Sequence, residues 1–173
     1  NVSRVLGNGL RPDIWMEFKN RFGIARVHEF YGASEGNTGF VNIFNFDKTV
    51  GWSPQYGSAW DVVQYDVDED EPVRGDDAFM KRMPVDETGL LITRITEQNP
   101  FDGYTDAQSS EKKILRDVFE KGDAWFNTGD LVVLQKHGHI QFGDRIGDTF
   151  RWQGENVATT EVESVIMKWP GIE

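Results

Sequence analysis

The chain of 173 residues has the length of one domain, and its 38% hydrophobic and 13% aromatic residues suffice for a sizeable core. Its 18 basic and 29 acidic residues give a net charge of −11, which argues against nucleic-acid binding through a basic face. The sequence has no cysteine, which excludes disulfides and thiolate metal sites, and no apolar run reaches the ~18 residues that span a bilayer.

The N-terminal part has a strand–helix–strand pattern. Ser3–Leu6 is predicted as a strand that leads into the loop Gly7–Leu10, and Pro12 suits the first turn of a helix. Apolar residues then recur at helical spacing: Trp15, Phe18 and Phe22. Gly23 is predicted to end this helix, and a second strand leads to Tyr31. This order is typical of a parallel sheet.

The middle of the chain is predicted to be mainly β. Phe40–Phe46 and Gly57–Tyr65 are rich in aromatic and β-branched residues and are broken by turn formers. Asp66–Asp77 is predicted as an acidic loop, and Gly89–Thr96 as a strand.

Two helices and a hairpin are predicted in the remainder. Ser110–Lys121 places Ile114, Leu115, Val118 and Phe119 on one helical face, with Gly122 closing it. Leu131–Leu134 and His139–Phe142 are predicted as a hairpin. Thr160 and Glu163 form a capping box for a last helix.

A glycine-rich hexapeptide, Tyr31–Gly36, follows the second predicted strand. Glycines allow a sharp turn and a close approach to a ligand, and open α/β sheets bind ligands at the carboxyl ends of their strands. The hydroxyl of Ser34 and the carboxylate of Glu35 fit two chemistries, a serine nucleophile and a nucleotide-phosphate site.

The serine interpretation rests on Gly32-x-Ser34-x-Gly36, with Asp130 and then a histidine (His137 or His139) in the expected chain order. A nucleophile elbow is followed directly by a helix, whereas residues 37–42 are poor helix formers. Asp130 and the histidines also lie close together in the sequence. A serine hydrolase using Ser34 is therefore the enzymatic alternative.

Metal-site signals are weaker. Asp66-x-Asp68-x-Asp70 imitates the start of a calcium-binding EF-hand loop, but Glu71 stands where that loop requires glycine. A solvated acidic loop is expected instead. The three histidines, His28, His137 and His139, are too scattered to suggest a metal centre.

Three later segments are unremarkable alone: Trp125–Leu131, Gly143–Asp148 and Arg151–Val157. In this order and spacing, together with Gly7–Pro12 and Tyr31–Asn37, they resemble the adenylate-forming acyl-CoA synthetases. Within that superfamily the chain is similar to the very-long-chain acyl-CoA synthetase and fatty-acid transport protein group, and the resemblance spans the whole chain.

The resemblance implies a mixed α/β fold in four parts. The end of a parallel AMP-binding subdomain would occupy residues 1–37, and a mainly β, barrel-like subdomain residues 38–143. A hinge would follow at residues 144–148, and the start of a small α+β C-terminal domain at residues 149–173.

The family's reaction has two steps, and the resemblance implies a role for each site residue. ATP and a fatty acid give an acyl-adenylate and pyrophosphate, and CoA then displaces AMP. Ser34 would bind the α-phosphate, and Glu35 would bind Mg²⁺, which prefers oxygen ligands. Tyr31 would stack on adenine, Asp130 would accept both ribose hydroxyls, and Arg145 would reach ribose or phosphate. Backbone groups lining the same pocket would come from Gly7, Asn8, Gly9, Leu10, Gly32 and Ala33.

The second step would use the C-terminal part. Gly147, where many relatives carry Asp or Lys, and Asp148 would form the hinge. The residues that lie where relatives approach CoA are Arg151, Gly154, Glu155 and Asn156.

The chain is expected to be a fragment of a long- or very-long-chain fatty acid–CoA ligase, because Asn1–Leu6 reads as the middle of a domain. The family's phosphate loop and catalytic lysine are expected outside it, so the fragment alone is expected to be inactive. A fatty-acid transport or binding protein without ligase activity is the non-enzymatic alternative. The resemblance implies a cytoplasmic parent protein and leaves open its peripheral association with a membrane.

Overall fold

The computed structural model describes residues 2–32, 38–103, 106–147, 149–152, 155–167 and 169. Its first elements are β1 (Arg4–Gly7), α1 (Trp15–Phe22) and β2 (Arg26–Gly32). β1 and β2 pair in parallel, which confirms the predicted strand–helix–strand unit. Gly23 ends α1 at φ 66°, where its N–H donates to the Lys19 carbonyl, as predicted. Trp15 is buried, whereas Phe22 at the other end of the predicted stripe is exposed.

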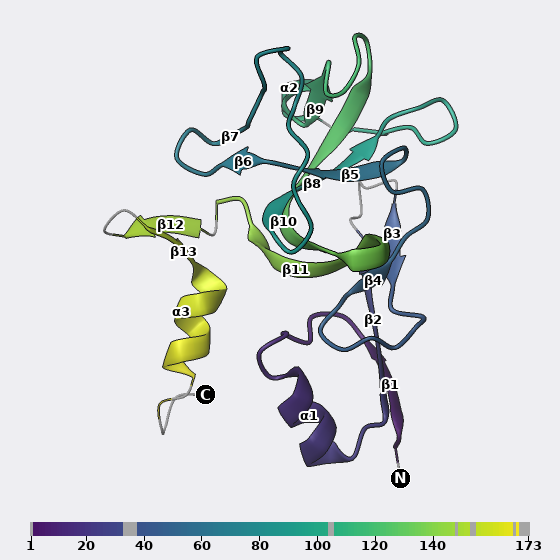
Figure 1. Cartoon of the computed structure of the whole chain (residues 1–173), viewed down its shortest axis with the longest axis vertical. Helices are drawn as coiled ribbons and strands as arrows, with labels where there is room; N and C mark the ends of the chain where they lie inside the picture. The colour runs from purple at the N-terminus through teal and green to yellow at the C-terminus, as the bar shows by residue number, and fades with distance from the viewer. Residues whose placement is uncertain are drawn as a thin grey trace.

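Seven further strands of the described chain extend this unit into one nine-stranded sheet (Figure 1). They are β3 (Gly39–Val41), β4 (Gly51–Trp52), β5 (Trp60–Val63), β8 (Thr88–Arg94), β9 (Ile114–Arg116), β10 (Ala124–Gln135) and β11 (His139–Arg145). The order is β1-β2-β3-β4-β11-β10-β8-β5, with β9 added to β10. The expectation of a barrel-like subdomain is wrong for the described strands, because the sheet is open and ends at β1 and β5. The parallel pair of β1 and β2 is joined to the antiparallel strands because the chain reverses between β2 and β3, which pair antiparallel.

The core covers both faces of this sheet. Successive residues of a strand point to opposite faces. Accordingly Trp60 and Val62 of β5 enter one apolar cluster with Phe40 and Ile140, whereas Val63 enters a second cluster. β8 divides in the same way, with Leu91 in the first cluster and its neighbours Leu90 and Ile92 in the second. A smaller cluster of Trp15, Ile24 and Val27 attaches α1.

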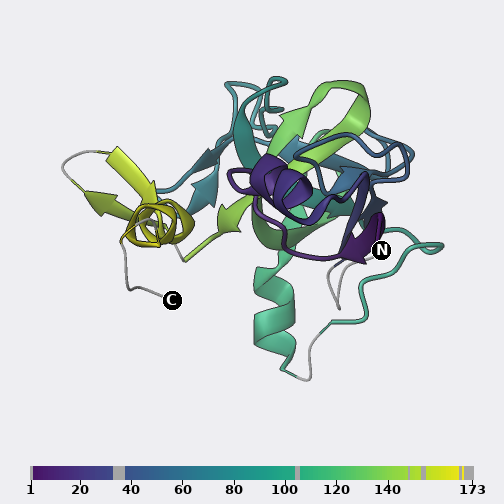
Figure 2. The same ribbon diagram turned by 90° about the horizontal axis from the view of Figure 1, so that it is seen from below.

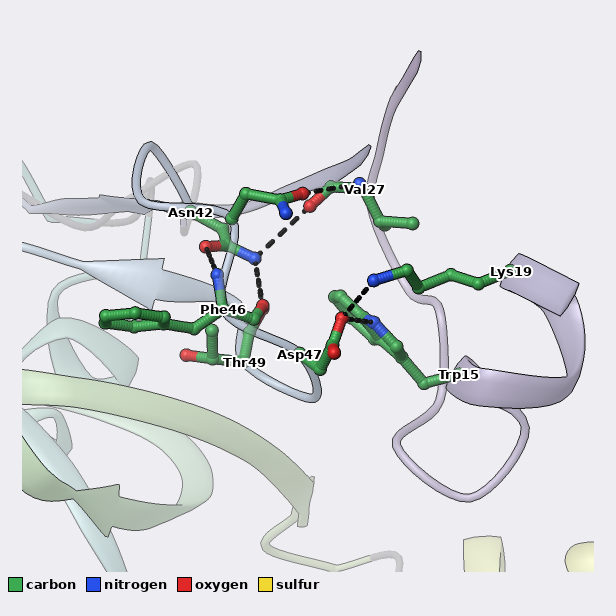
Figure 3. Close-up of polar contacts among 8 residues, drawn as sticks. Trp15, Lys19, Val27, Asn42, Phe46, Asp47 and Thr49 are labelled. Carbon is green, nitrogen blue, oxygen red and sulfur yellow. Dashed lines mark hydrogen bonds and ion pairs between the residues drawn. The ribbon is translucent and has the colours of Figure 1, made fainter. Parts of the chain in front are cut away.

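The predicted β segment Phe40–Phe46 is shorter in the structure, because β3 ends at Val41 and a loop follows. The buried side chain of Asn42 organises this loop: its Nδ2 donates to the Phe46 carbonyl at 2.7 Å, and its Oδ1 accepts the Phe46 N–H at 3.0 Å. Asp47 in the same loop accepts from Trp15 Nε1 and Lys19 Nζ, which attaches α1 to the sheet (Figure 3). Side-chain hydrogen bonds thus replace the strand ladder here.

The predicted helix Ser110–Lys121 is wrong. α2 spans Ala107–Lys112, begins at the side chain of Asp106 and gives way to β9, which pairs with β10. The reason lies in Asp123, whose carboxylate accepts the N–H groups of Val118 and Phe119 and holds a turn where the helix would continue. α2 projects away from the sheet (Figure 2).

The hairpin of β10 and β11 is confirmed, with a short 3₁₀ turn at Lys136–Gly138. A second hairpin, β6 (Tyr65–Asp66) with β7 (Glu71–Pro72), begins at the last residue of the predicted β segment Gly57–Tyr65 and continues into the predicted acidic loop. The C-terminal elements are β12 (Thr149–Trp152), β13 (Glu155–Ala158) and α3 (Thr159–Ile166), which starts one residue before the predicted cap. They lie beside the end of β11 (Figure 1). Among the described residues no helix is long and apolar enough to cross a membrane.

Candidate functional site

An open groove brings together segments that are far apart in the sequence. Its lining includes the loop after β1, the end of β2, the middle of β10 and the end of β11. The predicted residues in this lining are Asn8, Gly9, Leu10, Tyr31, Gly32, Asp130 and Arg145. The structure therefore gathers most of the described residues that were expected to bind a nucleotide.

The centre of the groove is a hydrogen-bonded cluster around Asp130. Tyr31 donates its hydroxyl to Asp130 Oδ2 at 2.5 Å, although 99 residues separate them. Arg145, opposite Asp130 in the β10–β11 ladder, places its Nε 3.3 Å from Oδ1. Asp130 is buried, while the Arg145 side chain is 71% exposed. The Tyr31 hydroxyl thus holds one oxygen of the Asp130 carboxylate, and the exposed guanidinium of Arg145 lies beside the other.

Burial and the neighbouring Asp130 carboxylate raise the pKa of Tyr31 well above its usual value. The phenol therefore stays protonated at physiological pH and remains a donor. An ionised carboxylate accepts through about four lone-pair directions, so Asp130 retains acceptor capacity beside Tyr31 and Arg145.

An irregularity in β10 places Asp130. The pairing of β10 with β8 shifts between Asn127 and Leu131, so the chain forms a bulge within a long strand at this point. Gly129 adopts φ 79°, a region that favours glycine. Thr128 fixes the bulge, because its Oγ1 donates to the Leu91 carbonyl and accepts the Asp130 N–H.

The loop after β1 is held by a residue that the sequence analysis missed. Glu29 on β2 is 2% exposed, and its carboxylate accepts the N–H groups of Gly9 at 2.8 Å and Leu10 at 3.3 Å. The sequence did carry a signal for this role. Glu29 lies two residues after Val27 and two before Tyr31, so its acidic side chain falls on the buried face of the strand.

The predicted hinge begins beside the cluster. The Ile146 N–H donates to the Gly129 carbonyl at 2.8 Å, and the Ile146 side chain packs on the second core cluster. Gly147 follows at φ 95°, a conformation that glycine adopts without strain. Asp148 lies outside the described residues, and both hinge assignments stay predictions.

The residues expected near CoA are described only in part. Arg151 lies in β12 opposite Asn156 of β13, and Glu155 lies opposite Trp152. Gly154 and the side chains of the other three lie outside the description, so their roles stay predictions.

Ala33, Ser34 and Glu35, together with Gly36 and Asn37, lie outside the described residues. Their flanks are informative, because Gly32 at the end of β2 pairs with Gly39 at the start of β3. The segment connects two antiparallel strands, whereas a nucleophile elbow leads from a strand into a helix.

The histidines also fail to complete a catalytic triad. In the β10–β11 ladder Asp130 lies opposite Arg145, and His139 lies opposite Gln135. Gln135 is five residues further along β10 than Asp130, so about 16 Å of strand separates Asp130 from the position of His139. His139 is buried under the rings of Phe44 and Phe46, and this burial lowers its pKa. The structure gives no support to a serine hydrolase.

The described residues contain no group of three or more carboxylates and histidines arranged to hold a metal ion. In the sequence that imitates an EF-hand, Asp66 instead accepts the N–H groups of Asp68 and Glu69 and forms a turn. Asp70 accepts the hydroxyl of Tyr65. Glu35, the expected Mg²⁺ ligand, lies outside the description.

Solved structures share this fold. ATP-bound MatB from Rhodopseudomonas palustris matches 98% of this chain and 30% of that protein, with a TM-score of 0.68 and 24% identity. The O-succinylbenzoate–CoA synthetase MenE from Bacillus subtilis, in complex with ATP and magnesium ion, matches with a TM-score of 0.62 and 19% identity over 98% of this chain and 32% of that protein. The fold is that of one segment of the acyl-CoA synthetases.

Curated relatives of higher sequence identity show which group of acyl-CoA synthetases this chain is similar to. The medium/long-chain-fatty-acid–CoA ligase FadD6 of Mycobacterium tuberculosis is 54% identical over 95% of this chain and 27% of that protein. Long-chain fatty acid transport protein 2 of Rattus norvegicus is 48% identical over 95% of this chain and 27% of that protein. No family model matches the chain. The chain is thus homologous to a segment of the adenylate-forming acyl-CoA synthetases, in the group of fatty-acid CoA ligases and long-chain fatty acid transport proteins. It spans about a quarter of the length of these relatives.

Proposed function

We propose that the chain supplies the adenosine end of the nucleotide site in an ATP-dependent fatty acid–CoA ligase. The observation that carries the proposal is the cluster of Tyr31, Asp130 and Arg145 beside the loop after β1. A buried carboxylate flanked by an aromatic ring and a cation suits a ribose, because the ring covers the base and the oxygens accept the two hydroxyls. The identity to fatty-acid CoA ligases supports the same conclusion.

In the proposed reaction the fatty acid carboxylate attacks the α-phosphorus of ATP, and pyrophosphate leaves. The CoA thiol then gives up its proton to solvent, and its sulfur attacks the acyl carbonyl. The bond between the acyl carbon and the phosphate oxygen breaks, and AMP leaves with that electron pair on its oxygen. This chemistry depends mainly on positioning and on donors aimed at phosphate oxygens. Arg145 is a donor whose exposed guanidinium can supply that charge, which matters in a chain of net charge −11.

Several roles rest on the resemblance alone. Ser34 would bind the α-phosphate, and Glu35 would be a ligand of Mg²⁺, which neutralises phosphate charge when bound. Gly147 and Asp148 would form the hinge between the parts at residues 38–143 and 149–173. The residues proposed for the CoA step are Arg151, Gly154, Glu155 and Asn156.

A second candidate is fatty-acid transport or binding without ligase activity. The names of several relatives favour it, since long-chain fatty acid transport protein 2 is among them. A carrier needs no ribose carboxylate, so the cluster around Asp130 favours the ligase. For the parent protein the proposed partners are a fatty acid, ATP and CoA. Its proposed location is the cytoplasm, with peripheral contact to a membrane.

The test is pyrophosphate release by the full-length protein with a series of fatty acids and CoA. Asp130→Asn and Glu35→Gln are each expected to lower kcat/KM for ATP at least tenfold, because each removes a charged acceptor or metal ligand. Glu97→Gln, an exposed carboxylate outside the groove, is the control. Hydrolysis of an acyl ester without ATP that survives both variants but fails in Ser34→Ala would favour the hydrolase. Fatty-acid binding without pyrophosphate release would favour the carrier.

A further inference from the structure

We propose that Glu29 is a positioning residue of the nucleotide site, which fixes the loop after β1 in the shape that selects adenine. The inference rests on the proposed function, because it assumes that the groove holds the base of ATP beside Tyr31. It adds a residue that the resemblance does not assign and a stated consequence, the preference for ATP over GTP.

Glu29 lies on the same face of β2 as Tyr31. Val27, Glu29 and Tyr31 alternate along β2 and so share one face of the strand. Tyr31 makes the hydrogen bond to Asp130, and both Glu29 and Tyr31 line the groove. Glu29 also stands opposite Gly7 in the parallel pair of β1 and β2. Its carboxylate therefore lies where β1 ends and the loop begins.

The Glu29 carboxylate holds the loop through two backbone hydrogen bonds. Oε2 accepts the Gly9 N–H at 2.8 Å, and Oε1 accepts the Leu10 N–H at 3.3 Å. In a planar trans peptide the C=O points opposite to the N–H. The carbonyls of Asn8 and Gly9 are consequently turned away from Glu29. The carbonyl oxygens of Asn8 and Gly9, which are two successive hydrogen-bond acceptors, are thus held in a fixed orientation.

The carbonyl oxygens on this loop bear on which base it accepts. Adenine carries an exocyclic amine that donates to carbonyl oxygens, whereas guanine carries a carbonyl at the same position. Because Glu29 engages the N–H groups of Gly9 and Leu10, the loop has carbonyl acceptors rather than these donors left for a base, and such a loop favours adenine. Gly9 at φ 99° completes the turn, since this backbone conformation favours glycine.

Burial of the Glu29 carboxylate is unfavourable unless its oxygens accept hydrogen bonds. A carboxylate that is 2% exposed costs more to bury than an apolar side chain, and the ordinary residue of a buried strand position is apolar. The hydrogen bonds that engage this carboxylate within the described residues come from the two loop amides. The charge is therefore directed at the loop.

The experiment compares ATP and GTP in the full-length protein. Glu29→Gln keeps the shape of the side chain but turns an NH₂ group toward one of the two amides, so one hydrogen bond is lost. The expected result is a KM for ATP about tenfold higher, kcat within about twofold of wild type, and an ATP:GTP ratio of kcat/KM about tenfold lower. Glu97→Gln is the matched control and should leave all three unchanged. Thermal unfolding is measured in parallel, since a structural role alone would lower the melting temperature and leave the ratio intact.

Two further variants keep the inference open to refutation. If Glu29→Gln does not fold, Glu29→Asp and Gly9→Ala disturb the same loop and are expected to lower the same ratio. An unchanged ATP:GTP ratio in the folded variants would overturn the role of Glu29. If the wild-type protein releases no pyrophosphate, the proposed function fails, and the binding of AMP and GMP by titration then tests Glu29 by itself.

Discussion

At the scale of single residues, the site is built on contacts that bridge distant parts of the chain. Tyr31 and Asp130 are 99 residues apart, and Glu29 holds amides about twenty residues before it. Each of these carboxylates is buried and accepts hydrogen bonds from neighbours that fix its position. Removing one donor therefore leaves an acceptor without its partner, which costs more than the bond itself contributes.

Tyr31→Phe is expected to lower the free energy of unfolding by about 1.5 kcal/mol, because the variant removes the donor to a buried, charged acceptor. The ring contact with Phe40, at 5.9 Å between centroids, is retained. Urea denaturation at neutral pH measures the change. Tyr56→Phe is the control, since its ring packs on Trp60 and its hydroxyl has no hydrogen bond in the described structure. Equal stability of the two variants would contradict the importance of the phenol.

The burial of His139 is expected to make the free energy of unfolding depend on pH. Burial lowers its pKa below the ordinary 6.5, so the unfolded chain binds a proton that the folded chain rejects. The stabilisation is present above pH 6.5 and is lost as the pH falls through the lowered pKa. His139→Phe, which keeps an aromatic ring between Phe44 and Phe46, is expected to lose less stability than wild type between pH 7.5 and 5. Thermal unfolding at both values measures this.

The control for this prediction is His137→Asn. His137 is exposed at φ 62°, a conformation that asparagine tolerates. This variant should keep the wild-type pH dependence. A parallel loss of stability in wild type and His139→Phe would show that His139 does not titrate on unfolding.

At the scale of elements, single side chains decide where helices and strands end. Asp123 replaces a predicted helix with a turn, and Asn42 ends β3 after three residues. The bulge at Gly129 keeps β10 continuous while it turns Asp130 toward Tyr31. In each case a side chain forms hydrogen bonds with backbone groups that would otherwise be paired within a regular helix or strand.

Asp123→Asn is expected to lower the free energy of unfolding by about 2 kcal/mol. Its carboxylate accepts the N–H groups of Val118 and Phe119 and the Nε1 of Trp125, and an amide presents only one oxygen for them. Val118 is buried in the second core cluster, so the turn holds part of the core. Denaturant unfolding measures the loss, with the exposed Asp102→Asn as control. A change below 0.5 kcal/mol would contradict this role.

The sequence predicts elements whose signals are local and misses those that depend on distant partners. Gly23 and the hairpin of β10 and β11 were predicted because their signals lie within a few residues. The prediction of a helix at 110–121 is wrong although the apolar residues do have helical spacing. Asp123, which follows the predicted helix, accepts backbone N–H groups that a helix would have used. Glu29 was missed because its partners lie on the preceding loop. The resemblance located Asp130 and Arg145, and the fold explains why the hydroxyl of Tyr31 reaches Asp130.

At the scale of the whole molecule, the two faces of the sheet near β2 and β3 differ. Tyr31 and Phe40 point into the core and the groove, whereas their neighbours Phe30 and Val41 are about 41% exposed. Ile43, Phe44 and Phe46 continue this apolar surface along the following loop, each more than half exposed. A surface of this kind is typical of contact with other protein or of self-association.

The last prediction is that the 173-residue chain alone catalyses no useful ATP–pyrophosphate exchange with a fatty acid. Its described residues hold the adenosine end of the proposed site, while the resemblance assigns the phosphate loop and the catalytic lysine to other segments. Positioning both ends of ATP supplies most of the rate in such a transfer, so half a site should be slower by several orders of magnitude. The measurement compares exchange by the isolated chain with that of the full-length protein, and light scattering checks for self-association through the apolar surface. Exchange within tenfold of the full-length rate would show that the chain carries the complete catalytic site.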